Sequence, residues 1–283
     1  MHFDFHFSAI QILWTLTLAA LLVLLVVLFG RDRARRFPCF TAAVATMAFR
    51  LIVNHMLLSR LPMVVASATY LVLVDLAQIL SLLVVLELAR RAFAGAKRRS
   101  WIVVTTILLA VAATVPVLWG PWPAWKTLSA ASIGSALRLM QLFAQKTELF
   151  ASTLAVLVGL LIVVAGRRFA AGWRSHAQQI AIGFSTASLA DLAVLAIRQL
   201  IAMHTTIHDQ ADYARVIGLL EKLTNANNAL YVAVLVWWIV WLWIDEPGAR
   251  SESVPAEASE TTVLETPAAS PDSATTPAET TGN

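Results

Sequence analysis

Long apolar stretches alternate with short polar segments along the chain as far as residue 244. A helix needs about 20 apolar residues to cross ~30 Å of hydrocarbon, and these stretches reach that length. The first stretch does not read as a signal peptide, because no Lys or Arg precedes it and its apolar run is too long. We therefore predict an all-α polytopic membrane bundle of seven transmembrane helices within residues 1–244. The expected spans are about 8–29, 39–60, 63–89, 101–120, 147–166, 177–203 and 224–244.

The composition makes the lipid bilayer the main expected partner of the chain. Hydrophobic residues make up 59% of the sequence and charged residues 13%, and the mean hydropathy is +0.73. A soluble domain is about 45–50% apolar and about 25% charged, so this mixture could not give it a water-facing surface. The formal net charge of +4 reflects Arg and Lys residues that flank the apolar stretches. A basic face on a polar domain is not indicated, so we expect no nucleic-acid partner.

Basic residues collect at alternate connections between the expected spans. Basic connections stay in the cytoplasm, so we expect the N-terminus outside and the C-terminus inside. The excess of Arg over Lys and the abundance of Ala suit a bacterium, and hence a multi-pass protein of a bacterial inner membrane. The connections after the first, third and fifth spans hold Arg31, Arg33, Arg35, Arg36, Arg90, Arg91, Lys97, Arg98, Arg99, Arg167, Arg168 and Arg174. The opposite side holds Arg60, Lys126, Arg138, Lys146, Arg215 and Lys222.

Three segments outside the expected spans need a separate interpretation. Residues 121–146 and 204–223 are long and amphipathic, so each could be a helix on the outer surface or an extension of the next span. We favour the extension. Residues 245–283 are rich in Pro, Ser and Thr, with eight acidic residues and no aromatic residue. Such a segment cannot bury enough apolar area to offset the entropy of ordering, so we expect a disordered cytoplasmic tail.

Ionisable residues inside the expected spans form a layer near the middle of the membrane. Arg50, Asp75 and Asp191 each lie ten to twelve residues from the outer end of a span, which is roughly 15–18 Å deep at ~1.5 Å per residue. Charges at this depth are costly, so they indicate either structural ion pairs or a functional site. In the structural alternative, Arg50 pairs with Asp75, and Asp191 pairs with Arg198 or Arg50. The candidate residues of this ligand-binding or structural layer are Arg50, Asn54, Asp75, Gln78, Asp191 and Arg198.

The sequence contains no strong catalytic, nucleotide-binding or metal-binding motif, so no cofactor and no metal are expected. A retinal protein needs a lysine inside its last span, whereas Lys222 lies at the outer edge of that span. Membrane hydrolases of the alkaline ceramidase type have a His-x-x-x-His in the seventh span, whereas His204 and His208 lie at the end of the sixth. An enzyme is therefore not favoured.

Two short motifs carry a resemblance to a known group of proteins. The third expected span ends in Glu87-Leu-Ala-Arg-Arg-Ala-Phe93, and the sixth opens with Ile180-Ala-Ile-Gly-Phe184. They are similar to uncharacterised seven-helix membrane proteins of bacteria, acidobacteria especially, over about residues 8–244. The resemblance implies the topology and no activity. Within the first motif, Glu87 is also spaced for a helical ion pair with Arg90 or Arg91.

Three classes of function stay open. We favour a receptor-like or sensory bundle that signals through a separate cytoplasmic protein, because no output domain follows the seventh expected span. The second class is a structural or accessory membrane subunit. The third is a transporter of a small molecule or an ion, with Arg50, Asp75 and Asp191 along its pathway.

Overall fold

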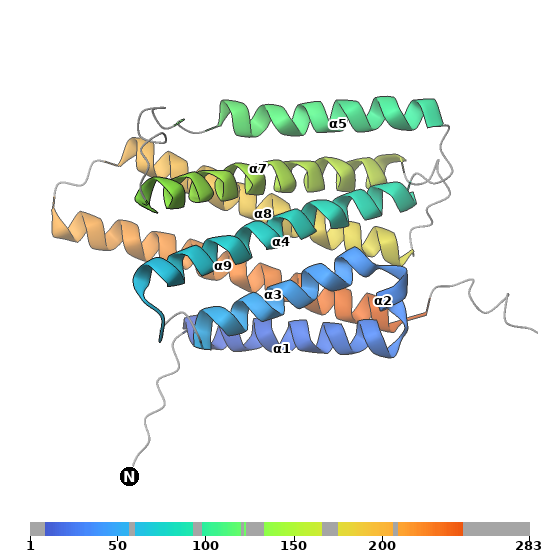
Figure 1. Ribbon diagram of the computed structural model, residues 1–283, viewed down its shortest axis with the longest axis horizontal. Coiled ribbons are helices and arrows are strands. Elements are labelled where there is room, and N and C mark those ends of the chain that lie inside the picture. The colour runs from blue at the N-terminus through green and yellow to red at the C-terminus, as the bar shows by residue number, and fades with distance from the viewer. Residues whose placement is uncertain are drawn as a thin grey trace, which may run out of the picture. The chain divides into compact units, whose positions relative to one another are not determined.

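The computed structural model describes residues 9–56, 60–92, 98–119, 122, 133–165, 175–205 and 209–245. The described residues are almost all helical, and they belong to one compact unit, Met1–Glu246. The expected tail lies outside the described residues except for Asp245. The helices are α1 Ala9–Gly30, α2 Arg33–Arg36, α3 Pro38–Met56, α4 Met63–Ala92, α5 Arg98–Leu118, α7 Ile133–Ala165, α8 His176–His204 and α9 Gln210–Trp243 (Figure 1).

Six of the described helices are long and apolar enough to cross a membrane, namely α1, α3, α4, α7, α8 and α9. They coincide with six of the seven predicted spans, and they support a multi-pass membrane protein. The remaining span was expected at 101–120. A helix, α5, does occupy that place, but its apolar part, Ile102–Leu118, is shorter than the six others.

Two of the expected outer connections are extensions of the helices that follow them. Helix α7 begins at Ile133 and α9 begins at Gln210, and both continue without a break into the predicted spans. The side chain of Asp209 caps α9 by accepting a hydrogen bond from the backbone N–H of Asp212 at 2.7 Å. The extension is thus confirmed for residues 133–146 and 210–223, and it adds about four turns to each helix.

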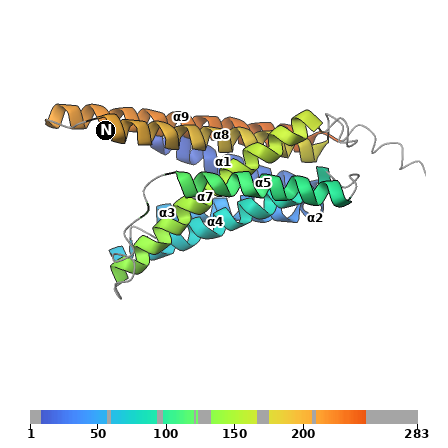
Figure 2. The same cartoon turned by 90° about the horizontal axis from the view of Figure 1, so that it is seen from above.

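Six helices follow one another in a closed ring. Helix α1 packs on α3, α3 on α4, α4 on α7, α7 on α8, α8 on α9, and α9 on α1. Figure 2 shows α8, α9 and α1 in one layer and α3 and α4 in the other, with α7 crossing from one layer to the other. Helix α5 packs on α7 from outside the ring (Figure 1). The interior is therefore formed by α1, α3, α4, α7, α8 and α9 alone.

Two glycines allow neighbouring helices of the ring to approach closely. A Cβ atom at Gly159 of α7 would lie 1.7 Å from Ser185 Oγ of α8, and one at Gly183 of α8 would lie 2.4 Å from Trp238 Nε1 of α9. The close approach lets the Ser185 hydroxyl donate a hydrogen bond across the helices to the Ala155 carbonyl oxygen at 2.8 Å. Small residues and interhelical hydrogen bonds of this kind stabilise helix contacts in membranes.

One end of the ring carries a concentration of Arg residues, and we call it the basic end. Here α1 and α9 end and α8 begins. Arg33 Nη2 lies 3.2 Å from Asp245 Oδ1, and Arg33 Nη1 lies 3.1 Å from His176 Nδ1. His176 Nε2 lies 2.9 Å from the Ile244 carbonyl oxygen, so Nε2 donates there and Nδ1 accepts from Arg33. These contacts join the α1–α2 turn to the start of α8 and the end of α9.

The Glu87 side chain, near the basic end of α4, caps the N-terminus of α3. Its Oε2 accepts hydrogen bonds from the backbone N–H groups of Cys39 at 3.2 Å and Phe40 at 3.3 Å. Its Oε1 accepts from Arg91 Nη2 at 3.1 Å, which confirms the helical ion pair expected from the spacing. A carboxylate at this position satisfies two free N–H groups and complements the helix dipole.

The interior of the ring at the basic end is filled by a buried apolar cluster. Nearly all of its members come from the C-terminal halves of α1, α4, α7 and α9 and from the N-terminal halves of α3 and α8, and Ala112 comes from α5. Successive ring helices are antiparallel, so these halves meet at one end. We call this set the apolar cluster, and its main members are Leu24, Leu28, Phe40, Val44, Val84, Leu88, Val158, Ile162, Ile180, Leu235, Trp238 and Leu242.

Candidate functional site

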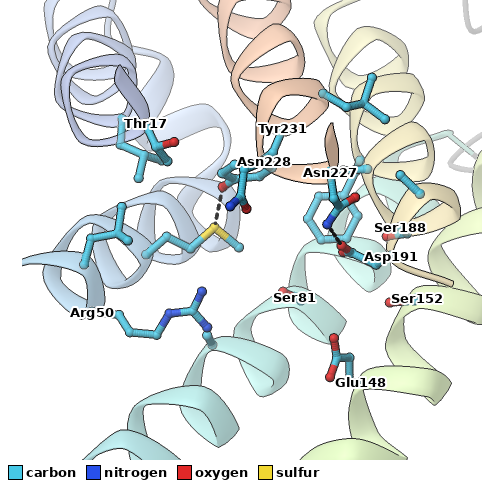
Figure 3. Close-up of a pocket in the computed structure, with 18 of the residues that line it drawn as sticks. Thr17, Arg50, Ser81, Glu148, Ser152, Ser188, Asp191, Asn227, Asn228 and Tyr231 are labelled. Atoms are coloured by element: carbon cyan, nitrogen blue, oxygen red, sulfur yellow. Dashed lines mark hydrogen bonds between the residues drawn. The ribbon is translucent and has the colours of Figure 1, made fainter. Parts of the chain in front are cut away.

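Beyond the apolar cluster, the ring encloses a polar cavity of about 380 Å³. All six ring helices line it and α5 does not. The lining on α1 runs from Ile10 in the first turn to Leu21 in the middle, so the cavity extends toward the end of the ring opposite the basic end. Its polar lining residues are Thr17, Arg50, Gln78, Ser81, Glu148, Ser152, Ser188, Asp191, Asn227, Asn228 and Tyr231 (Figure 3).

Helical spacing places these side chains on the inner faces of their helices. Residues three or four apart in a helix share a face, and each ring helix contributes such a set. On α8, Phe184, Ser188 and Asp191 line the cavity, as do Asn227 and Tyr231 on α9. The outer faces of the same helices expose large apolar side chains, for example Leu189 and Val236. Around the cavity the ring is therefore polar on the inside and apolar on the outside, which is the arrangement expected of a helix bundle surrounded by lipid.

Opposite charges face each other across the cavity. Arg50 of α3 lies on one side, and Glu148 of α7 and Asp191 of α8 lie on the other (Figure 3). Arg50 interacts electrostatically with both carboxyl groups. Nevertheless, among the described residues no salt bridge joins Arg50 to a carboxylate. The three charges therefore border a space that no direct protein ion pair closes.

Some cavity side chains are held in place by hydrogen bonds. Asn227 Nδ2 of α9 donates to Asp191 Oδ1 of α8 at 2.8 Å. The Tyr231 hydroxyl of α9 donates to the sulfur of Met47 on α3 at 2.9 Å. The first contact joins the neighbouring helices α8 and α9, and the second joins α9 to α3, which carries Arg50, so together they fix the positions of Asp191 and Tyr231 relative to Arg50.

Aromatic rings close the cavity at the boundary with the apolar cluster. Trp238 of α9 meets Phe40 of α3 edge to face, with ring centroids 5.1 Å apart, and stacks with Phe184 of α8 at 6.4 Å. Trp238 is 3% exposed, and Phe40 is 1% exposed. These three rings separate the polar cavity from the apolar interior near the basic end.

The structure brings together some of the residues predicted from the sequence. Arg50, Gln78 and Asp191 line the cavity. Asn54 and Asp75 do not, and each has one buried side-chain oxygen without a hydrogen-bond partner. Both belong to the α3–α4 side of the ring.

The expected ion pairs of the polar layer are corrected by the structure. Arg50 and Asp75 form no salt bridge, because Arg50 turns into the cavity whereas Asp75 does not line it. Asp191 pairs with Asn227 and not with Arg198. Arg198 is exposed, and its Nη2 donates to Thr224 Oγ1 at 2.8 Å.

Sequence reasoning missed several polar residues of the cavity, among them Glu148, Asn227, Asn228 and Tyr231. With the spans expected at 147–166 and 224–244, Glu148 and the two Asn residues fell at the outer edges. The helices begin 14 residues earlier in both cases, at Ile133 and Gln210, so these residues lie inside the ring. The amphipathic pattern that continues upstream of each span was the signal that could have located them.

The cavity has the properties of a binding site for a small polar molecule. Ligand sites are typically about 300–1,000 Å³, with few polar groups on a mainly apolar wall, and this cavity lies at the small and polar end of that range. Among the described residues, no group of three or more His, Cys, Asp or Glu side chains could hold a metal ion. Searches of this chain against protein-family models, curated proteins and solved structures found no match.

Proposed function

We propose that this chain is a receptor-like seven-helix membrane protein that binds a small polar molecule in the central cavity. The observation that carries the proposal is the position of Arg50, Glu148 and Asp191, which face one cavity without forming a direct ion pair. Charges in a membrane interior are costly and usually serve a function. A purely structural role would favour closed pairs, because an unpaired buried charge is destabilising.

The proposal includes α5 as the seventh span and a bacterial inner membrane as the location. Lys146 of α7 supports the first point, because its Nζ donates to the carbonyl oxygens of Pro116 at 2.9 Å and Trp119 at 2.5 Å. These bonds hold the end of α5 beside α7 at the end of the ring away from the basic end. The resemblance to seven-helix bacterial membrane proteins fits the same topology but adds no activity.

The N-terminus is proposed to lie outside and the basic end in the cytoplasm. Arg31, Arg33, Arg36, Arg90 and Arg91 gather at the basic end, as expected for cytoplasmic connections. In this orientation the cavity extends toward the outer side and the apolar cluster separates it from the cytoplasm. A reporter that is active only in the cytoplasm should work when fused after Arg250, and the opposite result would contradict this orientation.

Helices α8 and α9 offer a route from the cavity to a separate cytoplasmic partner. At the cavity they are joined by Asp191 and Asn227, and at the basic end by His176 and the Ile244 carbonyl. A ligand that changes the Asp191–Asn227 contact would move the ends of α8 and α9 at the contact of His176 with the Ile244 carbonyl. A cytoplasmic partner bound at the basic end would respond to that movement.

Transport is the second candidate, since facing charges near a membrane midplane also occur in transporters. The apolar cluster favours the receptor, because Leu28, Phe40 and Trp238 belong to a packed interior on the cytoplasmic side. Uptake of a ligand into proteoliposomes would contradict the receptor proposal. Binding without uptake would support it.

Cavity access can be tested with a water-soluble thiol reagent added from outside, in a Cys39→Ser background. Asn228→Cys, on the cavity lining, should react. Its neighbour Ala229 is exposed but does not line the cavity, so Ala229→Cys should not react if that face meets lipid. Failure of Asn228→Cys to react would contradict a cavity open to the outer side.

Ligand binding can be tested by screening small polar molecules for an increase in the melting temperature of the detergent-purified protein. Ala187→Phe would fill part of the cavity and should abolish the effect. Ala193→Phe is the matched control on the same helix, because Ala193 is exposed and does not line the cavity. Equal binding by both variants would place the ligand elsewhere.

A further inference from the structure

We infer that the cavity binds a zwitterion, a small molecule with a carboxylate at one end and an ammonium group at the other. The carboxylate would meet Arg50, and the ammonium group would meet Glu148 and Asp191. This inference rests on the proposed function and adds the chemical class of the ligand.

The Arg50 side is suited to an anionic group. Arg50 lines the cavity from α3, and its guanidinium donates no hydrogen bond to any described protein group. A guanidinium presents five donors in a planar fork that matches a carboxylate in two parallel bonds. The donors of Arg50 that face the cavity are thus free for a carboxylate of the ligand.

The opposite side is suited to an ammonium group. Glu148 and Asp191 come from neighbouring helices and interact with each other electrostatically as like charges. A cation between them would relieve this repulsion. An ammonium group has three donors, and Ser152 and Ser188 add hydroxyl acceptors on the same side of the cavity. Asp191 is held for this role by its hydrogen bond from Asn227.

Groups of both signs on opposite sides of the cavity favour a zwitterion over a simple ion. A lone cation would leave the donors of Arg50 without an acceptor, and a lone anion would leave Glu148 and Asp191 without a cation between them. A zwitterion meets both sides at once and adds no net charge to a site inside the membrane.

The size of the cavity limits the length of the ligand. Its volume of about 380 Å³ is near the lower end of the ~300–1,000 Å³ typical of ligand sites. Leu13, Trp14 and Leu51 contribute apolar wall to the cavity. The ligand is therefore the size of an amino acid, with a short apolar segment between its charges.

The test uses the full chain in lipid nanodiscs and calorimetric titration with probes of graded length. The zwitterions are glycine, β-alanine, 4-aminobutanoate and 6-aminohexanoate. Each is matched by an alkylammonium ion and an alkanoate of the same chain length. At least one zwitterion should bind at least tenfold more tightly than both of its matched ions. This comparison uses the wild-type protein, so it does not depend on the folding of any variant.

Substitutions then assign the two ends of the probe. Arg50→Gln, Glu148→Gln and Asp191→Asn should each weaken zwitterion binding at least tenfold. Arg60→Gln and Glu221→Gln, at exposed positions, and Asp212→Asn, at a half-buried position, are matched controls outside the cavity and should leave binding unchanged. If Arg50→Gln does not fold, Arg50→Lys keeps the charge without the fork and should still weaken binding.

The outcomes separate this inference from the proposed function. If an alkylammonium ion or an alkanoate binds as tightly as the zwitterion, and Ala187→Phe abolishes that binding, the zwitterion is wrong and the receptor proposal stands. If no zwitterion of the series binds, the inference is also wrong. If, in addition, Asn228→Cys is unreactive and the screen gives no ligand, the proposed function fails with it.

Discussion

At the basic end, the ring of six helices is filled by Leu28, Phe40, Leu235 and their neighbours, all nearly inaccessible. Toward the opposite end, the same six helices enclose a cavity lined by Arg50, Glu148 and other polar groups. Figure 2 agrees with this difference, since the two helix layers lie closer together at the basic end. One set of helices therefore builds a packed half and a hollow half.

The difference between the halves separates stability from function. Close packing gives many favourable dispersion contacts, and deletion of buried atoms leaves a cavity that costs free energy. The hollow half lacks this contribution and carries polar groups whose hydrogen bonds the protein does not fully use, such as those of Arg50 and Glu148. Substitutions in the packed half should reduce the free energy of unfolding, whereas those in the hollow half should mainly change binding.

The largest effect is expected for Trp238→Ala, at the boundary between the halves. Trp238 is 3% exposed and packs against Phe40 and Phe184. Removal of a buried aromatic side chain costs about 3–5 kcal/mol. Trp237→Ala is the matched control, because Trp237 is 41% exposed. Denaturation in detergent should show a much smaller loss for Trp237→Ala, and equal losses would contradict the packing described here.

The second effect is expected for Gly159→Ala, between α7 and α8. The new Cβ atom would lie 1.7 Å from Ser185 Oγ, so the two helices or the hydroxyl must move. Overpacking of this kind costs about 1–3 kcal/mol. Gly218→Ala in α9 has nothing within 4 Å and should instead be neutral or slightly stabilising. In the same detergent, the melting temperature of Gly159→Ala should fall, whereas that of Gly218→Ala should stay the same or rise slightly.

A smaller effect is expected for Glu87→Ala at the basic end. The substitution removes the acceptor of the Cys39 and Phe40 N–H groups and the partner of Arg91. Loss of such a cap costs about 1–2 kcal/mol. Glu221→Ala, at an exposed position of α9, is the control. If thermal unfolding of the two variants is the same, the cap does not stabilise α3.

The smallest effects on stability are expected in the hollow half. A double-mutant cycle of Arg50→Leu and Asp75→Leu should be additive within about 0.5 kcal/mol, because these residues form no ion pair. A cycle of Arg50→Leu and Asp191→Leu should show a coupling of about 0.5–1 kcal/mol, because the two charges interact across the cavity. Strong coupling in the Arg50–Asp75 cycle alone would contradict the structure and support the ion pair expected from the sequence.

The sequence by itself determined that the chain forms long apolar helices and that Arg50, Asp75 and Asp191 lie deep within them. Both properties are local, because helix length and apolar content follow from consecutive residues. The helical ion pair of Glu87 and Arg91 was predictable for the same reason. The sequence alone did not locate the starts of α7 and α9, since polar residues in an amphipathic helix extension resemble those of a surface helix.

Only the tertiary structure decided which of these residues meet. Arg50 and Asp75 have opposite charges and similar expected depths, but rotation of each helix about its axis decides which groups share a space. That rotation depends on packing between distant segments, such as Gly183 against Trp238 and Gly159 against Ser185. The ring therefore joins Arg50 to a cavity with Glu148 and Asp191, which lie about 100 and 140 residues further along the chain.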